Sequence, residues 1–249
     1  MANLFITVFY QPILNLLVFL YNTISFHDFG IAIILLTIVI KLILWPLGKQ
    51  SIKSQKSLQD LQPKIEALKK KYADNKTELS KATMDLYKAN KVNPFSSCLP
   101  LLVQLPFLWA VYRVFRDGVN NKLDLVYPFI NKPETINTIF LGFVNLAKPN
   151  VYLAVLAGLA QFIQAKMLIT KKPVVDTAGS KDEGMAAMMN KQMLYFMPAI
   201  TIFIGISLPG GLTLYWFVLT ALTALQQFVT FHKKAETGKD KLIEGEIIK

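Results

Sequence analysis

The chain of 249 residues is 53% hydrophobic and 17% charged, with a formal net charge of +11. Charged residues make up about 25% of an ordinary globular domain, and long apolar runs cause the deficit here, which favours a membrane protein. The single cysteine, Cys98, excludes an internal disulfide framework. The sequence has no His, Cys, Asp or Glu cluster with metal-ligand spacing, no phosphate-binding glycine loop and no Ser-His-Asp constellation. We therefore expect no metal, no cofactor and no enzymatic activity.

Residues 1–28 are largely apolar, but Gln11, Pro12 and Asn15 interrupt them, and they contain no lysine or arginine. They lack the positively charged start and the cleavage site of a signal peptide. This pattern predicts an extracytoplasmic interfacial helix that lies on the outer leaflet. The alternative is an additional span over residues 5–24, which would leave the N-terminus inside with no positive charge to hold it there.

Residues 29–48 predict the first transmembrane helix, because about 20 helical residues cross a bilayer. The run contains one charge, Lys41, and Thr37 lies four residues earlier on the same helical face. A lysine near the centre of a span costs about 2.5–3.5 kcal/mol on insertion scales, and the other predicted spans contain no acid that could pair with it. We expect Lys41 to face a water-filled cavity that opens to the cytoplasm. The alternative is that its stem bends until the ammonium reaches the cytoplasmic headgroups.

Residues 49–93 predict a cytoplasmic antiparallel helical hairpin. Apolar residues recur every three or four positions in two series, Leu58, Leu61, Ile65, Leu68 and Tyr72, and then Leu79, Ala82, Leu86 and Ala89. The segment ADNKTE between them predicts a turn, with Asn75 and Glu78 at the spacing of a helix-capping pair. A hairpin of this length is a candidate docking arm. The alternative is a solvated charged face without a partner.

The remaining apolar runs predict four more transmembrane helices, which makes the fold all-α with five membrane spans. The later segments are spans at 94–116, 151–169, 191–208 and 212–231, an extracytoplasmic loop at 117–150, a cytoplasmic loop at 170–190, an extracytoplasmic turn at 209–211 and a cytoplasmic tail at 232–249. Pro209, Gly210 and Gly211 divide the last apolar run in two. The span at 191–208 is short for a hydrocarbon core of about 30 Å, so we expect local thinning of the bilayer there.

The lysines indicate the orientation in the cell membrane. Residues 48–92, 170–192 and 232–249 together contain 20 lysines, whereas residues 1–28 and 117–150 contain three. Because cytoplasmic segments carry the excess of positive charge, we expect the N-terminus outside and the C-terminus in the cytoplasm. Most of the positive charge is explained by contact with anionic lipid. Ribosomal RNA remains an alternative partner for the lysine-rich loop and tail.

Several predicted spans carry polar side chains at helical spacing. They are Gln104 in the second span, Gln161 and Gln164 in the third, and Thr220, Thr223 and Gln227, which continue a stripe from Trp216, in the fifth. A helical bundle would turn such side chains inward. Together with Lys41 they predict a wet, positively charged groove within the membrane.

Four sequence blocks carry a resemblance to a known family. "LQPKI" (61–65), "LYKANKVNP" (86–94), "CLPLLVQLPF" (98–107) and "LPGGLTLYWFV" (208–218) occur in the order and spacing of the YidC membrane-protein insertases, which are relatives of the mitochondrial Oxa and chloroplast Alb proteins. The resemblance covers about residues 8–232. It implies a five-span core, a cytoplasmic hairpin, and a hydrophilic groove that is closed to the outside and open to cytoplasm and lipid.

The resemblance also implies roles for individual residues. In the family, a groove arginine in the first span attracts the substrate, and Lys41 stands at the matching position. Lysine keeps the charge but lacks the planar fork of donors. Gln104 matches a groove glutamine, and Thr37, Tyr215 and Trp216 match positions associated with substrate contact. The large extracytoplasmic domain of some members is absent, and the short tail lacks the basic extension that relatives use on ribosomes.

The function implied is that of an insertase and chaperone, which moves nascent transmembrane segments from the cytoplasm into the bilayer. The hydrophobic effect would then drive their release into lipid. The implied partners are nascent membrane proteins and membrane lipids, with the ribosome and a Sec-type translocon as further candidates. Two alternatives stay open: a small-solute or ion transporter with Lys41 as counter-ion, which inverted repeats would favour, and a membrane scaffold that docks partners through the hairpin.

Overall fold

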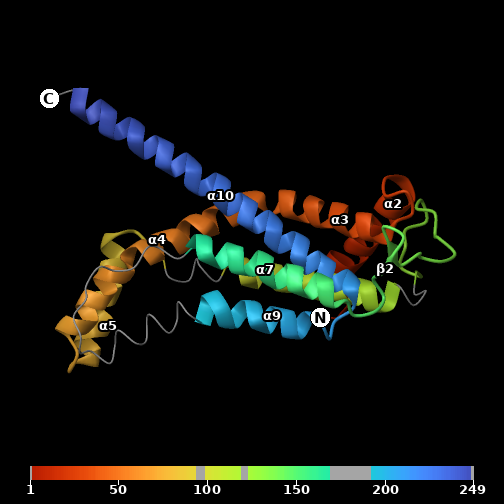
Figure 1. The fold of residues 1–249 in the computed structure, drawn as a ribbon, viewed down its shortest axis with the longest axis horizontal. Helices are drawn as coiled ribbons and strands as arrows, with labels where there is room; N and C mark the ends of the chain where they lie inside the picture. The colour runs from red at the N-terminus through yellow and green to blue at the C-terminus, as the bar shows by residue number, and fades with distance from the viewer. Residues whose placement is uncertain (1, 94–98, 119–122, 169–191, 248–249) are drawn as a thin grey trace.

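The computed structural model describes residues 2–93, 99–118, 123–168 and 192–247. Within these ranges, side chains are described for residues 4–93, 102–116, 123–168 and 192–231. The chain is an elongated bundle of helices, with a helical arm at one end and loops with a short β-hairpin at the other (Figure 1). The prediction of an all-α polytopic membrane protein is confirmed.

The elements follow one another as helices with one short break into strands. They are α1 (Ala2–Phe5), the π-helical turn η1 (Ile6–Tyr10), α2 (Gln11–Thr23), α3 (Phe29–Ile43), α4 (Trp45–Lys71), α5 (Lys76–Ala89), α6 (Leu99–Arg113), η3 (Val114–Gly118), β1 (Ile139–Phe140), β2 (Val144–Asn145), α7 (Val151–Leu168), η4 (Gln192–Phe196), α9 (Met197–Gly205) and α10 (Gly210–Ile247). The antiparallel strands pair Ile139 with Asn145 and Phe140 with Val144. This β-hairpin lies inside the segment predicted as an extracytoplasmic loop.

Three described helical stretches are long and apolar enough to cross a membrane: Ile6–Thr23, Val151–Leu168 and Gly210–Phe231. A fourth results if α3 and α4, which meet at a bend of 70°, count as one broken span. Gln192–Gly205 is apolar but shorter, in agreement with the short span expected there. The described part of the second predicted span begins at Leu99, so the count of five spans stays a prediction.

The bend between α3 and α4 divides the first predicted span. Helix α3 ends at Ile43 and α4 begins at Trp45, so the first helix of the arm starts inside the segment predicted as 29–48. Pro46 in the first turn of α4 explains the break, because proline has no N–H to donate and its ring clashes with the carbonyl four residues earlier. From there α4 continues without interruption through Pro63 to Lys71.

The arm consists of α4 and α5, and the turn between them lies where the sequence predicted it. Asn75 caps α5, and the backbone N–H of Glu78 donates to the Asn75 side chain at 3.1 Å. Helices α4 and α5 contact each other next to this turn. The predicted cytoplasmic loop at 170–190 lies outside the described residues. Helix α10 continues to Ile247, through most of the segment predicted as a tail.

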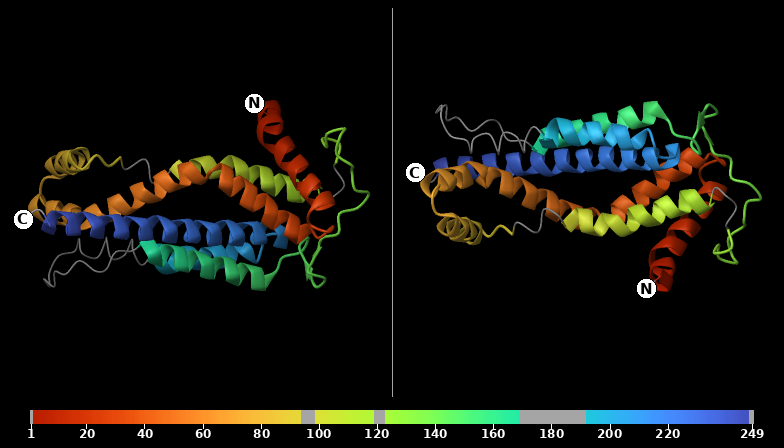
Figure 2. Two further views of the ribbon diagram at one scale, coloured as in Figure 1. Left: turned by 90° about the horizontal axis from the view of Figure 1, so that it is seen from above. Right: turned by 90° about the horizontal axis from the view of Figure 1, so that it is seen from below.

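The N-terminal helix, formed by α1, η1 and α2, packs against the loops at the end of the bundle that lies opposite the arm. Figure 2 shows that it leaves the bundle at a steep angle to the other helices. The Asn15 side chain, 3% exposed, donates to the carbonyl of Leu125 at 3.0 Å and accepts from the N–H of Tyr127 at 2.6 Å. Asp28 caps α3 and also accepts from the N–H of Leu141 at 2.8 Å. These bonds tie the loop that precedes α7 to the N-terminal helix and to the start of α3.

The main apolar core lies where α2, α3, α6 and the start of α10 meet, with Leu14, Leu36, Val111 and Leu212 among its buried members. Helices α7 and α9 pack on the other side of α10, and their polar link is the hydroxyl of Thr201, which donates to the Gln161 side chain at 2.5 Å. Helix α10 therefore lies between two groups of helices and contacts both.

Candidate functional site

Lys41 lies one turn before the bend, on the side of α3 that faces α10. Its ammonium donates to the hydroxyl of Thr223 at 2.8 Å, and that hydroxyl donates in turn to the carbonyl of Leu219 at 2.7 Å. The Lys41 side chain is half-buried and has no carboxylate partner within the described part of the chain. Thr223 belongs to the stripe expected on the fifth span. A hydroxyl can accept a hydrogen bond from an ammonium, but it cannot neutralise the charge.

Gln104 and Tyr215 meet directly between α6 and α10. The Gln104 amide nitrogen donates to the Tyr215 hydroxyl at 2.6 Å. Tyr215 is fully buried, whereas Gln104 is half-buried. Tyr215 precedes Thr223 by eight positions, so this contact lies about 12 Å closer to the start of α10 than the one made by Lys41.

The other two predicted groove residues differ in exposure. Thr37 is fully buried, and its hydroxyl donates to the carbonyl of Ile33 in its own helix at 2.6 Å. Trp216 is half-buried on α10. A role of Thr37 or Trp216 in substrate contact stays a prediction. Of the five predicted residues, the structure joins only Gln104 and Tyr215 by a direct hydrogen bond.

The sequence reasoning missed Gln226, which lies on α10 one turn after Thr223. Its amide nitrogen donates to the backbone carbonyl of Trp45 at 2.8 Å, at the start of α4. The same amide packs against Gly48, where an added Cβ would lie 2.8 Å from its oxygen. The expected stripe contained the neighbouring Gln227 instead. Gln227 is also fully buried, but its amide oxygen and nitrogen have no partner among the described residues.

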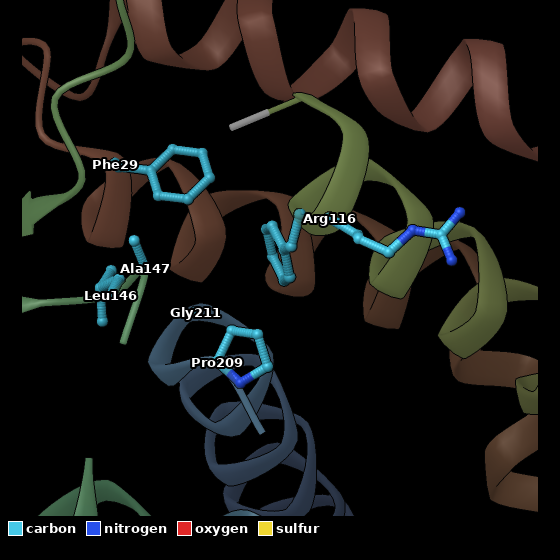
Figure 3. Close-up of a pocket in the computed structure, with 7 residues that line it drawn as sticks. Phe29, Arg116, Leu146, Ala147, Pro209 and Gly211 are labelled. Atoms are coloured by element: carbon cyan, nitrogen blue, oxygen red, sulfur yellow. The ribbon is translucent and has the colours of Figure 1, made fainter. Parts of the chain in front are cut away.

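A cavity of about 190 Å³ lies at the opposite end of the bundle (Figure 3). Its lining residues are Phe29, Phe115, Arg116, Leu146, Ala147, Pro209 and Gly211. None of the predicted groove residues lines it, and the guanidinium of Arg116 points away from the other labelled residues (Figure 3). Within the described residues, no group of three or more His, Cys, Asp or Glu is placed to hold a metal ion.

The polar contacts form a line along α10 that joins it to α6, α3 and α4 in turn. The line contains the ammonium of Lys41, the hydroxyls of Thr223 and Tyr215, and the amides of Gln104 and Gln226. Such an arrangement can attract an acidic group and can exchange hydrogen bonds with a polar segment.

Comparison with known proteins identifies the family. The model of the family described as 60Kd inner membrane protein matches residues 19–237. A membrane protein insertase YidC of Fusobacterium nucleatum is 36% identical over 230 residues, which cover 91% of this chain and 98% of that protein. The chain belongs to the YidC family of membrane protein insertases. It is accordingly a multi-pass protein of the cell membrane.

Two further YidC relatives are longer than this chain. The YidC protein of Syntrophus aciditrophicus is 38% identical over 88% of this chain, and that of Geobacter metallireducens is 33% identical over 87%. The matched region covers 35% of each of these relatives, so the chain spans about a third of their length. The region that matches the family model, residues 19–237, contains the line of polar contacts on α10 and both helices of the arm.

Proposed function

We propose that this YidC-family protein moves nascent transmembrane segments from the cytoplasm into the lipid bilayer, and that it acts on them as an insertase and chaperone. The segment enters a hydrated groove at the contact between α3 and α10, and the groove is lined by Lys41, Thr37, Gln104, Tyr215 and Trp216. The observation that carries this proposal is the ammonium of Lys41, which lies between apolar helices with a threonine hydroxyl at 2.8 Å and no carboxylate among the described residues.

The energetic argument concerns the charge. A lysine at membrane depth costs about 2.5–3.5 kcal/mol on insertion scales, and the cost is reduced where water reaches the ammonium. One hydrogen bond from a hydroxyl in a membrane contributes only about 0.6–1.7 kcal/mol. Thr223 alone therefore does not offset the cost of the charge. Water in a groove that opens to the cytoplasm does offset the cost of the charge. The same water lowers the free-energy cost of moving the polar flank of a client into the membrane.

In the proposed route, the client arrives at the arm formed by α4 and α5. Its hydrophilic outer flank enters the groove, drawn by Lys41, while its apolar part slides along α3 and α10 into lipid. Burial of apolar surface in the bilayer then drives release. The N-terminus lies outside and the C-terminus in the cytoplasm, and α2 lies in the outer interface. The ribosome and a Sec-type translocon are the candidate partners in delivery.

The test uses proteoliposomes that contain only this protein and a short single-span client with either acidic or neutral outer residues. Lys41→Ala should lower insertion of the acidic client about tenfold, which corresponds to the loss of about 1.4 kcal/mol of attraction, and should change the neutral client much less. Lys41→Arg should retain activity because the charge is kept. Lys49→Ala is the matched control, since it removes an exposed lysine two turns farther along the chain.

Equal insertion by the wild type, Lys41→Ala and Lys41→Arg would show that this lysine does no electrostatic work and reaches the headgroups instead. A wild-type protein that inserts neither client but supports a solute flux would favour the transporter alternative. A protein that does neither, yet binds partners through the arm, would favour the scaffold.

A further inference from the structure

Two hydrogen bonds join α10 to the broken first span on either side of the break. Before the break, Lys41 of α3 donates to Thr223 at 2.8 Å. After the break, the carbonyl of Trp45, the first residue of α4, accepts from Gln226 at 2.8 Å. The bonded positions are four residues apart on one side and three on the other, so both bonds lie within about one helical turn.

The Gln226 amide packs closely against the first turn of α4, where its nitrogen has a hydrogen-bond partner and its buried oxygen has none among the described residues. Gly48 provides the surface on which the amide lies, because a Cβ at this position would be 2.8 Å from the amide oxygen and 3.1 Å from the nitrogen. Pro46 stops α3 from continuing in a straight line. The direction that α4 takes after the break then depends on what holds its first turn, and Gln226 binds that turn.

We propose that Gln226 is a positioning residue of the insertase: its amide holds the first turn of α4 against α10, and it thereby fixes both the direction of the arm and the place of Lys41 beside Thr223. The expected effect on insertion rests on the proposed function, whereas the expected effect on the position of the arm does not. It connects the arm, where a client would arrive, to the groove in which it would be inserted.

Gln227 offers a control of the same residue type. Both glutamines are fully buried on α10 and are adjacent in sequence, but only Gln226 forms a hydrogen bond to α4. Substitution by methionine keeps the length of either side chain and removes its hydrogen-bonding atoms. Any effect of lost polarity or altered packing should then be common to both variants, whereas the hydrogen bond to α4 should be lost only in Gln226→Met.

The experiment measures the distance from the arm to the bundle in nanodiscs by pulsed electron spin resonance. Spin labels are placed at Lys64 on α4 and Lys166 on α7, both exposed, in a Cys98→Ser background. Gln226→Met should shift or broaden the distance distribution, with about a threefold rise in the displaced population, as expected for the loss of one hydrogen bond between helices in a membrane. Gln227→Met should leave the distribution as in the wild type.

Gly48→Ala gives an independent variant, because its new methyl group displaces the Gln226 amide without removing it. It should reproduce the effect of Gln226→Met on the distance, and both variants should lower insertion of the acidic client several-fold. The proposal is overturned if Gln226→Met leaves the distance unchanged, if Gln227→Met changes it equally, or if the arm moves while insertion of the acidic client stays at the wild-type level. If the distance shifts but Lys41→Ala inserts normally, the arm is positioned as proposed and the electrostatic groove is refuted.

Discussion

Asn15 is predicted to hold the loop at residues 123–137 in place, although it is a polar residue within an apolar helix. It is 3% exposed and makes two bonds to the loop, one to the carbonyl of Leu125 and one from the N–H of Tyr127. A third bond, to the carbonyl of Gln11 at 2.7 Å, stays within its own helical segment. Asn15→Leu keeps the number and branching of the side-chain heavy atoms and removes all three bonds.

The expected cost follows from counting the bonds that cross to the loop. Each contributes about 0.5–1.5 kcal/mol net, and a buried N–H left without an acceptor costs about 1–3 kcal/mol. The carbonyl of Leu125 keeps a second donor, the Gln11 side chain at 3.2 Å, whereas the N–H of Tyr127 loses the acceptor on Asn15. We therefore expect a local loss of about 2 kcal/mol, which corresponds to about a thirtyfold rise in the open population of the loop.

Hydrogen exchange in nanodiscs measures this opening. Peptides that cover residues 123–137 should exchange about thirtyfold faster in Asn15→Leu, while peptides from α10 should keep the wild-type rate. Asn22→Leu is the control, since Asn22 is half-buried and donates a single bond to the carbonyl of Asn131 at 2.7 Å, and it should accelerate exchange only a few-fold. Unchanged exchange of the loop in Asn15→Leu, or equal acceleration throughout the chain, would refute the assignment of Asn15 as the residue that holds the loop.

Two further predictions concern the stability of the bundle. Gly30→Ala should lower the thermal midpoint, because the new Cβ would lie 2.1 Å from Cδ2 and 2.8 Å from Cβ of Phe140. Overpacking of this kind costs about 1–3 kcal/mol. Combination with Phe140→Ala should restore the midpoint in a thermal scan. Gln227→Met should raise the thermal midpoint, because it removes two buried polar atoms that have no partner among the described residues. Leaving such a group unpaired costs about 1–3 kcal/mol. A fall in the midpoint would show that the Gln227 amide forms a stabilising contact.

The local features of the fold could be predicted from the sequence. Hydrophobic periodicity located the helices, and the spacing of Asn75 and Glu78 located the turn of the arm, because capping depends on residues only three apart. The contact of Lys41 with α10 was foreseeable only in outline. A polar stripe that contains Thr223 faces inward in a bundle, but the pairing of one side chain with another depends on the helix register.

The features that the sequence did not indicate depend on contacts between distant segments. Asn15 was interpreted as a break in an apolar face, typical of a helix at the interface, but its amide is buried because the loop supplies backbone partners more than a hundred residues away. The strands Ile139–Phe140 and Val144–Asn145 are too short for an alternating pattern to indicate them. Gln226 differs from Gln227 only by rotation about the helix axis, which composition does not reveal.

The free energies of the polar contacts on α10 decide which of these contacts requires water. The hydrogen bonds from Gln104 to Tyr215 and from Gln226 to Trp45 each contribute about 0.6 kcal/mol on average for a membrane interior, close to the thermal energy. Such bonds determine which side chains of α10 meet those of its neighbours, whereas the apolar core holds the helices together. The charge of Lys41 costs several times more when it is left dry. In the proposed function, hydration of the groove therefore follows from this one ammonium rather than from the amide contacts.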